Sequence, residues 1–312
     1  MSNTQESLQQ DSLQQDSRQQ PPLVDSGGEF AKNYNRTSFS FHHSLKGNPL
    51  FQLPSLIDYS RRLPADGGLA YWSNGSAKVD DRWDKSGGPR YSLQDTIANI
   101  AENNSLVLLK RVELDREYGP CVRNLMNTVV SLVGPALAHD IVIGRATILI
   151  ASPRRLTSYH IDADTNFLFQ VHGDKKISVF DQTDRSIISD QELERYYSGD
   201  LNGAKFNEAR QKDAHTYDLD AGIGIHIPCM APHWAKNTEN LSVALSINFD
   251  LHSIVRLARI YKLNHRLRNY GLNPKPPGIS RPRDQLKLAA AGSLAALRRV
   301  LRGQRTPAAS MN

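Results

Sequence analysis

The sequence predicts a mainly β protein with flanking helices, in which short antiparallel strands form a barrel or jelly roll. Short segments of apolar or alternating residues follow one another between residues 141 and 250, and turns rich in Gly, Pro, Asp and Asn separate them. Helical spacing of apolar residues is confined to the regions before and after this stretch, apart from residues 190–197. A series of strands with this punctuation is typical of closed all-β architectures.

The composition is that of an ordinary globular protein. The 312 residues are 39% hydrophobic and 22% charged, which predicts one large domain with appendages. Cys121 and Cys229 are the two cysteines and lie outside any CxxC pattern, which indicates a reducing compartment and argues against a zinc ribbon. No apolar run approaches the ~20 residues that span a bilayer, and the polar N-terminus does not resemble a secretory signal. We therefore expect a cytoplasmic protein.

The chain divides into three predicted parts. Residues 1–30 are glutamine-rich and are expected to be disordered, because they cannot bury enough apolar area to offset the ordering entropy. Residues 31–250 are expected to form the main domain, with its barrel core at about 140–250. Residues 251–312 are expected to form a basic helical extension, since they hold 13 Lys/Arg and one acidic residue, a net charge of +12. The rest of the chain, with 25 basic and 31 acidic residues, has a net charge of −6.

The individual elements are predicted in chain order. The periodicity and the stop signals predict helices over 48–64, from Ser92 with Asp95 as capping-box partner, over 116–133 before Gly134, over 190–197, over 252–270 and over 284–301. Strands are predicted over 67–74, 105–112, 141–152, 158–173, 176–181, 216–220, 224–229 and 241–250.

A candidate metal site lies in the stretch LTSYHIDADTNFLFQVHGDKK, residues 156–176. His160 and Asp162 are two residues apart on a predicted strand, so their side chains point to the same face. His233, at a strand start after a Pro-bounded turn, completes two histidines and one carboxylate, the facial triad of non-haem Fe(II) oxygenases. An HxD pair alone is a weak signal. Indeed His172 and Asp174 form a second pair, which we expect to be solvated on a hairpin turn.

The surroundings of the first pair resemble the JmjC/cupin-like 2-oxoglutarate oxygenases. The similarity is highest to the branch that contains the asparaginyl hydroxylase of the hypoxia-inducible factor. That family's pattern reads T-x-x-H-x-D-x-x-x-N-F, then Q-x-x-G-x-K, then a distal H and, fifteen residues later, an N-F pair. The residues at these positions are Thr157, His160, Asp162, Asn166-Phe167, Gln170, Gly173, Lys175, His233 and Asn248-Phe249. The resemblance covers about residues 140–250.

The resemblance implies a double-stranded β-helix (cupin/jelly-roll, JmjC-type) barrel with C-terminal helices and oxygenase activity. Fe(II) would be held by His160, Asp162 and His233, with 2-oxoglutarate as cosubstrate and O2 as oxidant. The family uses a threonine beside the lysine on the distal carboxylate of the oxo-acid, which here gives Thr157 and Lys175. An aspartate in the triad is usual in hydroxylase members, so hydroxylation of a protein side chain or small molecule is preferred over N-demethylation.

The residues themselves are compatible with these roles. The distal carboxylate of 2-oxoglutarate needs a cation, and strand alternation lets either Lys175 or Lys176 point inward, with the spacing favouring Lys175. The amides of Asn166 and Asn248 can hold a metal-bound ligand from outside the metal shell. His226 is expected to be structural or to face the substrate. Trp234 is expected to pack at the barrel rim, and Cys229 to be a small buried side chain.

Two other functions stay open at this point. A non-catalytic cupin-like module would keep the barrel, with or without a metal, as a regulatory or interaction domain. A zinc hydrolase with the same triad would need a general-base carboxylate nearby, and no HExxH or GxSxG stretch suggests one.

The basic extension has three interpretations. It can be a solvated tail, because runs of charge usually are. It can form a homodimer interface, whose apolar face would consist of Ile254, Leu257, Tyr261, Leu294, Leu297, Val300 and Leu301. It can also contact an anionic membrane surface or nucleic acid through Arg298, Arg299, Arg302 and Arg305.

Overall fold

The computed structural model of the chain describes residues 22–25, 27–64, 68–82 and 88–303, and the side chains up to 293. Most of the segment 1–30, predicted to be disordered, lies outside the described residues. At its end the prediction needs correction, because Leu23–Val24 (β1) and Glu29–Asn33 (α2) are ordered elements. Leu23 and Phe30 are buried, and the ring of Phe30 stacks on Phe167 at 5.7 Å between centroids. Two apolar side chains thus anchor the end of an otherwise polar segment.

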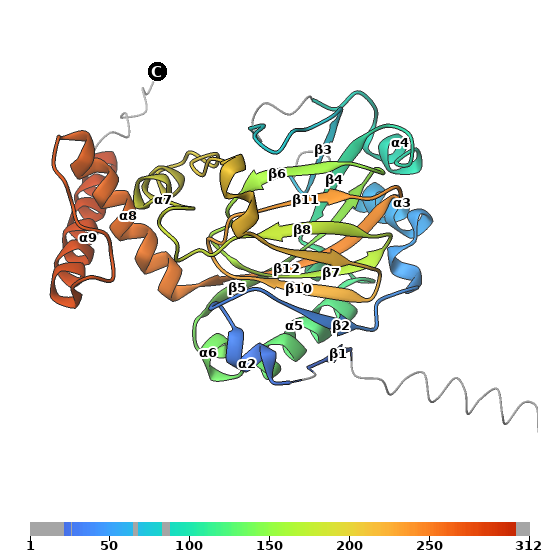
Figure 1. The fold of residues 1–312 in the computed structure, drawn as a ribbon, viewed down its shortest axis with the longest axis horizontal. Coiled ribbons are helices and arrows are strands. Elements are labelled where there is room, and N and C mark those ends of the chain that lie inside the picture. The colour runs from blue at the N-terminus through green and yellow to red at the C-terminus, as the bar shows by residue number, and fades with distance from the viewer. Residues whose placement is uncertain (1–21, 26, 65–67, 83–87, 304–312) are drawn as a thin grey trace, which may run out of the picture.

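Two antiparallel sheets lie face to face and form the body of the described chain (Figure 1). The larger has the strand order β1-β2-β10-β7-β12-β5-β4-β3, and the smaller β6-β11-β8-β9. The remaining strands are β2 (Phe39–His43), β3 (Ala70–Asn74), β4 (Ser105–Lys110), β5 (Ile141–Ala151), β6 (Leu156–His160), β7 (Thr165–His172), β8 (Lys175–Val179), β9 (His215–Leu219), β10 (Ile223–Ile227), β11 (His233–Asn237) and β12 (Ser242–Leu251).

From β5 to β12 the chain alternates between the two sheets, except that β8 and β9 follow each other within the smaller one. Strands β5, β7, β10 and β12 belong to the larger sheet, whereas β6, β8, β9 and β11 belong to the smaller one. Every pairing between these strands is antiparallel. This is the double-stranded β-helix, or jelly roll, so the predicted fold class is confirmed.

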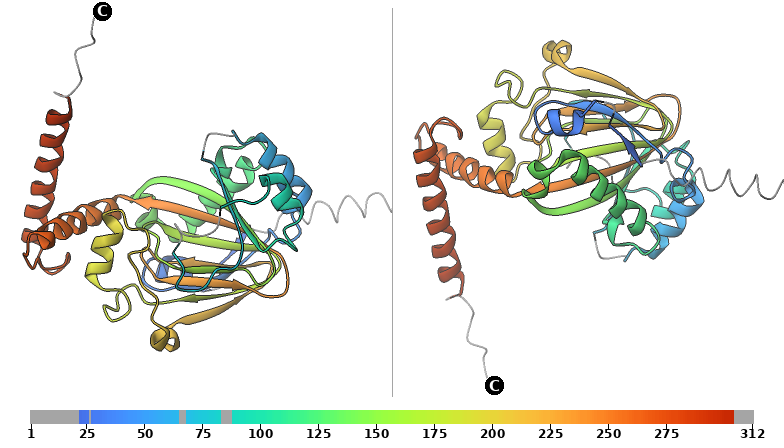
Figure 2. Two further views of the ribbon diagram at one scale, coloured as in Figure 1. Left: turned by 90° about the horizontal axis from the view of Figure 1, so that it is seen from above. Right: turned by 90° about the horizontal axis from the view of Figure 1, so that it is seen from below.

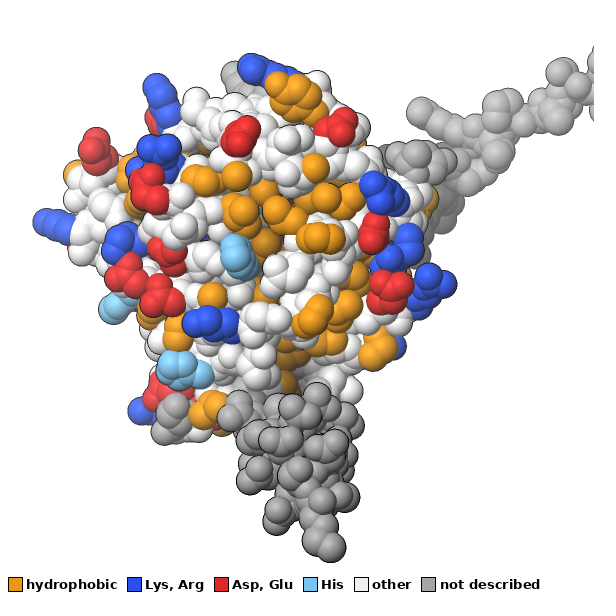
Figure 3. Space-filling view, turned by 90° about the vertical axis from the view of Figure 1, so that its right-hand side faces the viewer, with side chains coloured by type: hydrophobic (Ala, Val, Ile, Leu, Met, Phe, Trp, Pro, Cys, Tyr) orange, Lys and Arg blue, Asp and Glu red, His pale blue; other side chains and the backbone are white. Residues whose placement is uncertain are grey.

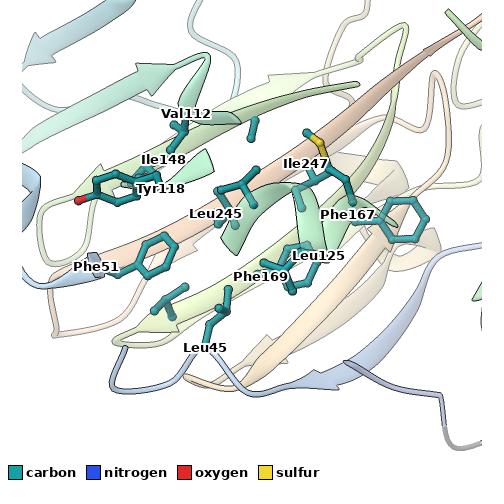
Figure 4. Close-up of a cluster of buried hydrophobic side chains, with 14 of the residues drawn as sticks. Leu45, Phe51, Val112, Tyr118, Leu125, Ile148, Phe167, Phe169, Leu245 and Ile247 are labelled. Carbon is teal, nitrogen blue, oxygen red and sulfur yellow. The ribbon is translucent and has the colours of Figure 1, made fainter. Parts of the chain in front are cut away.

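Strand alternation separates an outer core from the barrel interior. Phe167 and Phe169 on β7 and Leu245 and Ile247 on β12 point to the outer face of the larger sheet, where they pack against the flanking helices (Figure 4). The residues between them point into the barrel, where Leu168 and Ala244 join a separate apolar cluster. Burying each large apolar side chain contributes roughly 1.5–3 kcal/mol. Strands buried on both faces explain why these segments are nearly continuous apolar runs.

Apart from the short helix α6, which the sequence analysis did not predict, the helices that follow α2 lie where the sequence predicts them. They are α3 (Leu53–Arg62), α4 (Leu93–Ala98), α5 (Gly119–Val133), α6 (Pro135–Ala138), α7 (Asp190–Tyr197), α8 (His252–Asn269) and α9 (Arg281–Gly303). The side chain of Ser92 accepts a hydrogen bond from the N–H of Asp95, which confirms the predicted N-cap of α4. Helices α2, α5 and α6 cover the outer face of the larger sheet, whereas α8 leads away from the barrel to α9 (Figures 1 and 2).

The C-terminal helices are joined to the barrel through α7. Tyr261 of α8 is buried and stacks on Tyr197 of α7, with 5.6 Å between ring centroids. Ile254 and Leu257 pack against the chain's own apolar clusters as well. These three residues of the predicted dimer face are therefore occupied within one chain, and the other four lie outside the described side chains. The homodimer stays a prediction.

The surface opposite the C-terminal helices has a different character. Hydrophobic side chains gather across its centre, and side chains of both charge signs surround them (Figure 3). The excess of positive charge is thus not concentrated on this face. In the part of the chain that the structure describes, no helix has the length and apolar character to cross a membrane.

Candidate metal centre and its cavity

Three predicted ligands meet at one end of a cavity between the two sheets. His160 on β6 lies directly opposite His233 on β11, because the two residues are register partners. Their ring centroids are 4.1 Å apart. The Oδ2 atom of Asp162 lies 3.7 Å from Nε2 of His160 and 3.9 Å from Nε2 of His233. The three ligand atoms lie within 4.8 Å of one another, which is close enough to bind one metal ion.

Main-chain carbonyl groups determine which ring nitrogen of each histidine faces the ion. Nδ1 of His160 bonds to the carbonyl of Ser158 at 2.7 Å, and Nδ1 of His233 to the carbonyl of Ala231 at 2.9 Å. Since a carbonyl only accepts, both Nδ1 atoms carry the proton and both Nε2 atoms present a lone pair toward Asp162. Burial, with a contribution from His160, lowers the pKa of His233 to about 4. This imidazole is therefore neutral at pH 7, as a metal ligand must be.

Asp162 does not lie on a strand, and here the sequence prediction is wrong. The predicted strand 158–173 is two strands in different sheets, β6 and β7, joined by residues 161–164. The carbonyl of Asp162 accepts a hydrogen bond of 2.7 Å from the N–H of Met230, and the N–H of Ala163 donates to the hydroxyl of Tyr196 on α7 at 3.1 Å. Met230 has φ of 61°, an unusual conformation for a residue with a side chain. The turn before His233 thus also holds the aspartate.

Lys175 lies toward the other end of the same cavity, as predicted. On β11, Asn237 is the partner of Lys175, four residues beyond His233, a distance of roughly 13 Å at the usual strand rise. Lys175 is 7% exposed, and burial lowers its pKa to about 8, so it stays mostly protonated at pH 7. Lys176 points outward and pairs with Asp218. Lys175 has no carboxylate partner among the described residues.

The turn before Lys175 is the predicted solvated hairpin. His172 is exposed, and Asp174 accepts hydrogen bonds from Thr238 and Asn240, so neither takes part in the metal cluster. Gly173 has φ of +69°, and a Cβ there would lie 2.0 Å from the carbonyl oxygen of Leu241. Only glycine fits this turn. The side chain of Gln170 donates to the carbonyls of residues 172 and 173 and so fixes the hairpin from inside the barrel.

Two amides lie on the larger sheet, on the wall that faces the smaller one. Asn166 and Asn248 are register partners on β7 and β12, and both line the cavity together with Thr157. Ser246, which the sequence analysis missed, accepts a hydrogen bond of 3.0 Å from Nδ2 of Asn166 and donates one of 2.7 Å to Oδ1 of Asn248. Its position two residues before Asn248 on one strand was the available signal. Oδ1 of Asn166 is buried and has no partner among the described residues.

The cavity has a volume of about 910 Å³ and extends from Lys175 past the triad to a charged mouth. Asp164 lies in this mouth, and burial, with Asp162 and Asp250 nearby, raises its pKa to about 7. Arg145 pairs with Asp250 at 2.5 Å and lies 3.8 Å from Asp164. The sequence analysis did not find this cluster, because its members come from β5, the 161–164 connection and β12.

The other polar residues singled out in the sequence have structural positions. His226 is fully buried, its Nδ1 donates to the carbonyl of Asn166 and its Nε2 accepts from the N–H of Asn35. Trp234 is partly buried and donates to Gln211 at 2.9 Å. Cys229 is buried, as expected, and is not part of the metal cluster.

The similarities to known proteins are distant. No protein-family model matches the sequence, and neither does any curated protein. The solved structure of the Escherichia coli ribosomal oxygenase YcfD is 16% identical over 91% of this chain and 68% of that chain, with a TM-score of 0.47. A structure of the same E. coli protein in complex with cobalt and 2-oxoglutarate gives 15% identity, the same coverage and a TM-score of 0.48.

A second kind of similar structure covers only part of the chain. The oxalate decarboxylase of Lactobacillus farciminis, in a formate complex, matches 38% of this chain and 26% of that chain at 20% identity, with a TM-score of 0.23. Similarities at this level carry no functional conclusion. The strand topology and the side chains themselves define a jelly-roll protein with a candidate metal centre of two histidines and one aspartate.

Proposed function

We propose that the protein is an oxygenase that uses Fe(II), 2-oxoglutarate and O2 to hydroxylate a protein side chain or a small molecule. One observation carries the proposal: a two-histidine, one-carboxylate cluster and a buried lysine line one cavity, and no described residue supplies a counter-ion for the lysine. A metal alone would explain the cluster but not the lysine. A metal together with an organic diacid explains both.

The triad fits a ferrous ion by the chemistry of its donors. His160 and His233 offer neutral Nε2 atoms, and Asp162 offers one carboxylate. This donor set on one face leaves open positions for an oxo-acid and for O2. When bound, the iron and its two cosubstrates supply the oxidising chemistry, and the protein supplies position, charge and exclusion of water.

The far end of the cavity fits the distal carboxylate of 2-oxoglutarate. The ammonium group of Lys175 is the partner that a buried carboxylate requires, and Thr157 lines the same cavity with a hydroxyl group. The oxo-acid and the lysine side chain together span the separation between the triad and the backbone of Lys175. Asn166, Ser246 and Asn248 form a hydrogen-bonded row beside this path, where the free Oδ1 of Asn166 can accept a further hydrogen bond.

Anaerobic titration with Fe(II) and 2-oxoglutarate tests the proposal directly. We expect a metal-to-ligand charge-transfer band in the visible spectrum, which His160→Ala abolishes. Lys175→Gln leaves the bound carboxylate without its charge partner, a loss of about 2–5 kcal/mol, so the oxo-acid should bind about 30-fold to several thousand-fold more weakly. Lys176→Gln is the matched control, because that side chain lies on the outer face, and its titration should follow the wild type. A flat spectrum in the wild-type protein would leave a non-catalytic cupin-like module as the better explanation.

A metal-dependent hydrolase is the second candidate, and Asp164 is the observation that favours it. Such a hydrolase needs a carboxylate as general base, and the carboxylate of Asp164 lines the same cavity as the triad. Lys175 has no role in that reaction. Ester or amide hydrolysis by the Zn(II)-loaded protein that disappears in Asp164→Asn, without any complex with 2-oxoglutarate, would establish the hydrolase instead.

A further inference from the structure

The larger sheet continues beyond the barrel and forms an apolar shelf inside the cavity. Strands β4 and β3 follow β5 at this edge, and Leu69, Tyr71, Leu106 and Leu108, hereafter the outer shelf, line the cavity. Tyr71 is the register partner of Leu108, and Leu108 is the partner of Leu149 on β5. The residues between them, such as Val107 and Leu109, point to the outer core and are fully buried. Alternation therefore gives the cavity an apolar wall outside the metal centre.

A single cation lies at the end of the outer shelf without a partner. Lys110 follows Leu106 and Leu108 on the same face of β4, is half-buried and lines the cavity. No carboxylate or hydrogen-bond acceptor among the described residues contacts its ammonium group. A half-buried lysine can lay its stem on apolar side chains and keep its ammonium group in solvent, so this group is accessible to an anionic ligand in the cavity.

The other cations of the cavity are already paired or needed for the oxo-acid. Arg82 lies 3.4 Å from Asp200, and Arg111 lies 2.5 Å from Glu113. Arg145 has two carboxylates, those of Asp250 and Asp164. Lys175 is assigned to 2-oxoglutarate by the proposed function. Lys110 is thus the cation that remains for a substrate.

We propose that the outer shelf and Lys110 bind the substrate, and that this substrate has an apolar body with one anionic group, such as a carboxylate. The oxidation of this substrate rests on the proposed function, whereas its chemical class rests on the outer shelf and Lys110. Lys110 on β4 is the register partner of Thr147 on β5, and Thr147 is the register partner of Ser246 on β12, beside the two amides. The backbone of Lys110 is therefore two strand spacings, about 10 Å, from the row of Asn166, Ser246 and Asn248. The anionic group and the oxidised carbon are therefore far apart in the substrate.

A matched set of probes tests the charge preference. Octanoate, octanol and octylamine share an eight-carbon chain and differ in the charge at one end. Their binding to the full chain can be measured by saturation-transfer NMR, which needs no metal. In protein loaded with Mn(II) and 2-oxoglutarate, paramagnetic relaxation of the probe protons reports their distance from the triad. We expect octanoate to bind at least tenfold more tightly than octanol, and its terminal methyl protons to relax fastest.

Substitutions at Lys110 separate charge from packing. Lys110→Met should reduce octanoate binding to the level of octanol, Lys110→Arg should retain the preference, and Lys110→Glu should transfer it to octylamine. Leu108→Asn should weaken all three probes by a similar factor. Lys176→Met, on the outer face, is the control and should change none of the affinities. Thermal melting of each variant checks that the fold is kept.

Two results would overturn the proposal. One is equal affinity of the wild-type protein for octanoate and octanol, and the other is a preference that persists in Lys110→Met. Failure of the oxygenase proposal would look different, because the charge-transfer band would be absent while the metal-free NMR experiment still showed the carboxylate preference.

Discussion

At the scale of single residues, the same local hydrogen bond determines the tautomer of both histidine ligands. Each Nδ1 donates to the main-chain carbonyl two residues before it, at Ser158 for one ring and Ala231 for the other. The tautomer therefore depends on local backbone geometry and is fixed without the metal. Lys175 is also oriented by local structure, because a hairpin glycine and strand alternation suffice to turn its side chain inward. The histidine tautomers follow from main-chain hydrogen bonds and the direction of Lys175 from strand alternation. Of the residues that produce these features, the glycine is the one whose type marks it in the sequence.

His226 gives a prediction of pH-dependent stability. Burial lowers its pKa in the folded protein to about 3, whereas an unfolded histidine has a pKa near 6.5. Between these values the unfolded state binds a proton that the folded state does not, so the free energy of unfolding falls as the pH falls. The slope is about 1.4 kcal/mol per pH unit. His226→Gln removes this loss, and its stability difference from the wild type should narrow by about 2–3 kcal/mol between pH 6.5 and pH 4.5.

Denaturant unfolding at a series of pH values measures this difference. His172→Gln is the matched control, because that ring is exposed on the hairpin. Parallel stability curves for the wild type and His226→Gln would contradict the prediction.

At the scale of elements, the sequence predicts that a helix or strand exists more accurately than where it begins and ends. The predicted helix over 190–197 agrees with α7 residue for residue, and the strand segments after residue 140 all contain observed strands. The strand 158–173 is the failure, because two strands of similar composition follow each other with only residues 161–164 between them. That connection contains no glycine or proline that would indicate a turn in the sequence. Its position follows from tertiary contacts, the bonds of Asp162 and Ala163 to Met230 and Tyr196.

The same limit applies to the candidate site. The ligands and Lys175 could be found because their spacing along the sequence is fixed. Asp164 and Arg145 could not, because their contacts depend on the register between β5, β7 and β12. For Ser246 the spacing from Asn248 was a signal that the sequence analysis did not use. The irregularity between β6 and β11 has a similar effect, since it brings both Thr157 and His160, three residues apart, to the cavity.

The contact between α7 and α8 gives a prediction at this scale. Arg268 of α8 bonds both carboxylate oxygens of Glu194 of α7, at 2.8 and 3.1 Å, and the Glu194 side chain is 1% exposed. Arg268→Met leaves a buried carboxylate without its partner and should lower the free energy of unfolding by about 3–5 kcal/mol. The double variant with Glu194→Gln should recover part of this loss. Arg61→Met breaks an ion pair that is 64% exposed on both sides and should change stability by about 0.5 kcal/mol or less.

Equilibrium unfolding in denaturant measures all three variants. If Arg268→Met were no less stable than Arg61→Met, the ion pair would not be what joins α8 to α7, and the stacking of Tyr261 on Tyr197 would be the main contact.

At the scale of the whole molecule, function and charge lie in different parts of the chain. The barrel and its helices carry the cavity and a net negative charge, and the extension from residue 251 carries the positive charge. Helices α8 and α9 lead away from the barrel (Figures 1 and 2). One described contact between them is the hydrogen bond that the ammonium group of Lys287 on α9 donates to Asn264 of α8. The extension can therefore contact a partner without rearranging the cavity. Contact with an anionic surface stays a proposal that rests on this charge pattern. Location in the cytoplasm stays a prediction that rests on the cysteine usage and the polar N-terminus.

Removal of α9 tests whether the extension accounts for binding to polyanions. Residues 281–312 hold seven Lys/Arg and one Asp, so a chain ending at Ser280 has a net charge of 0 instead of +6. We expect the full chain to bind heparin at low salt, with an affinity that falls steeply as salt rises, and the shortened chain to elute near the void volume. Changing Arg298, Arg299, Arg302 and Arg305 to Gln keeps the length and leaves a net charge of +2, so elution should be intermediate. Unchanged retention of the shortened chain would place the polyanion contact outside residues 281–312, on the barrel or on α8. Unchanged retention of the four-Gln variant would show that these four arginines do not make the contact.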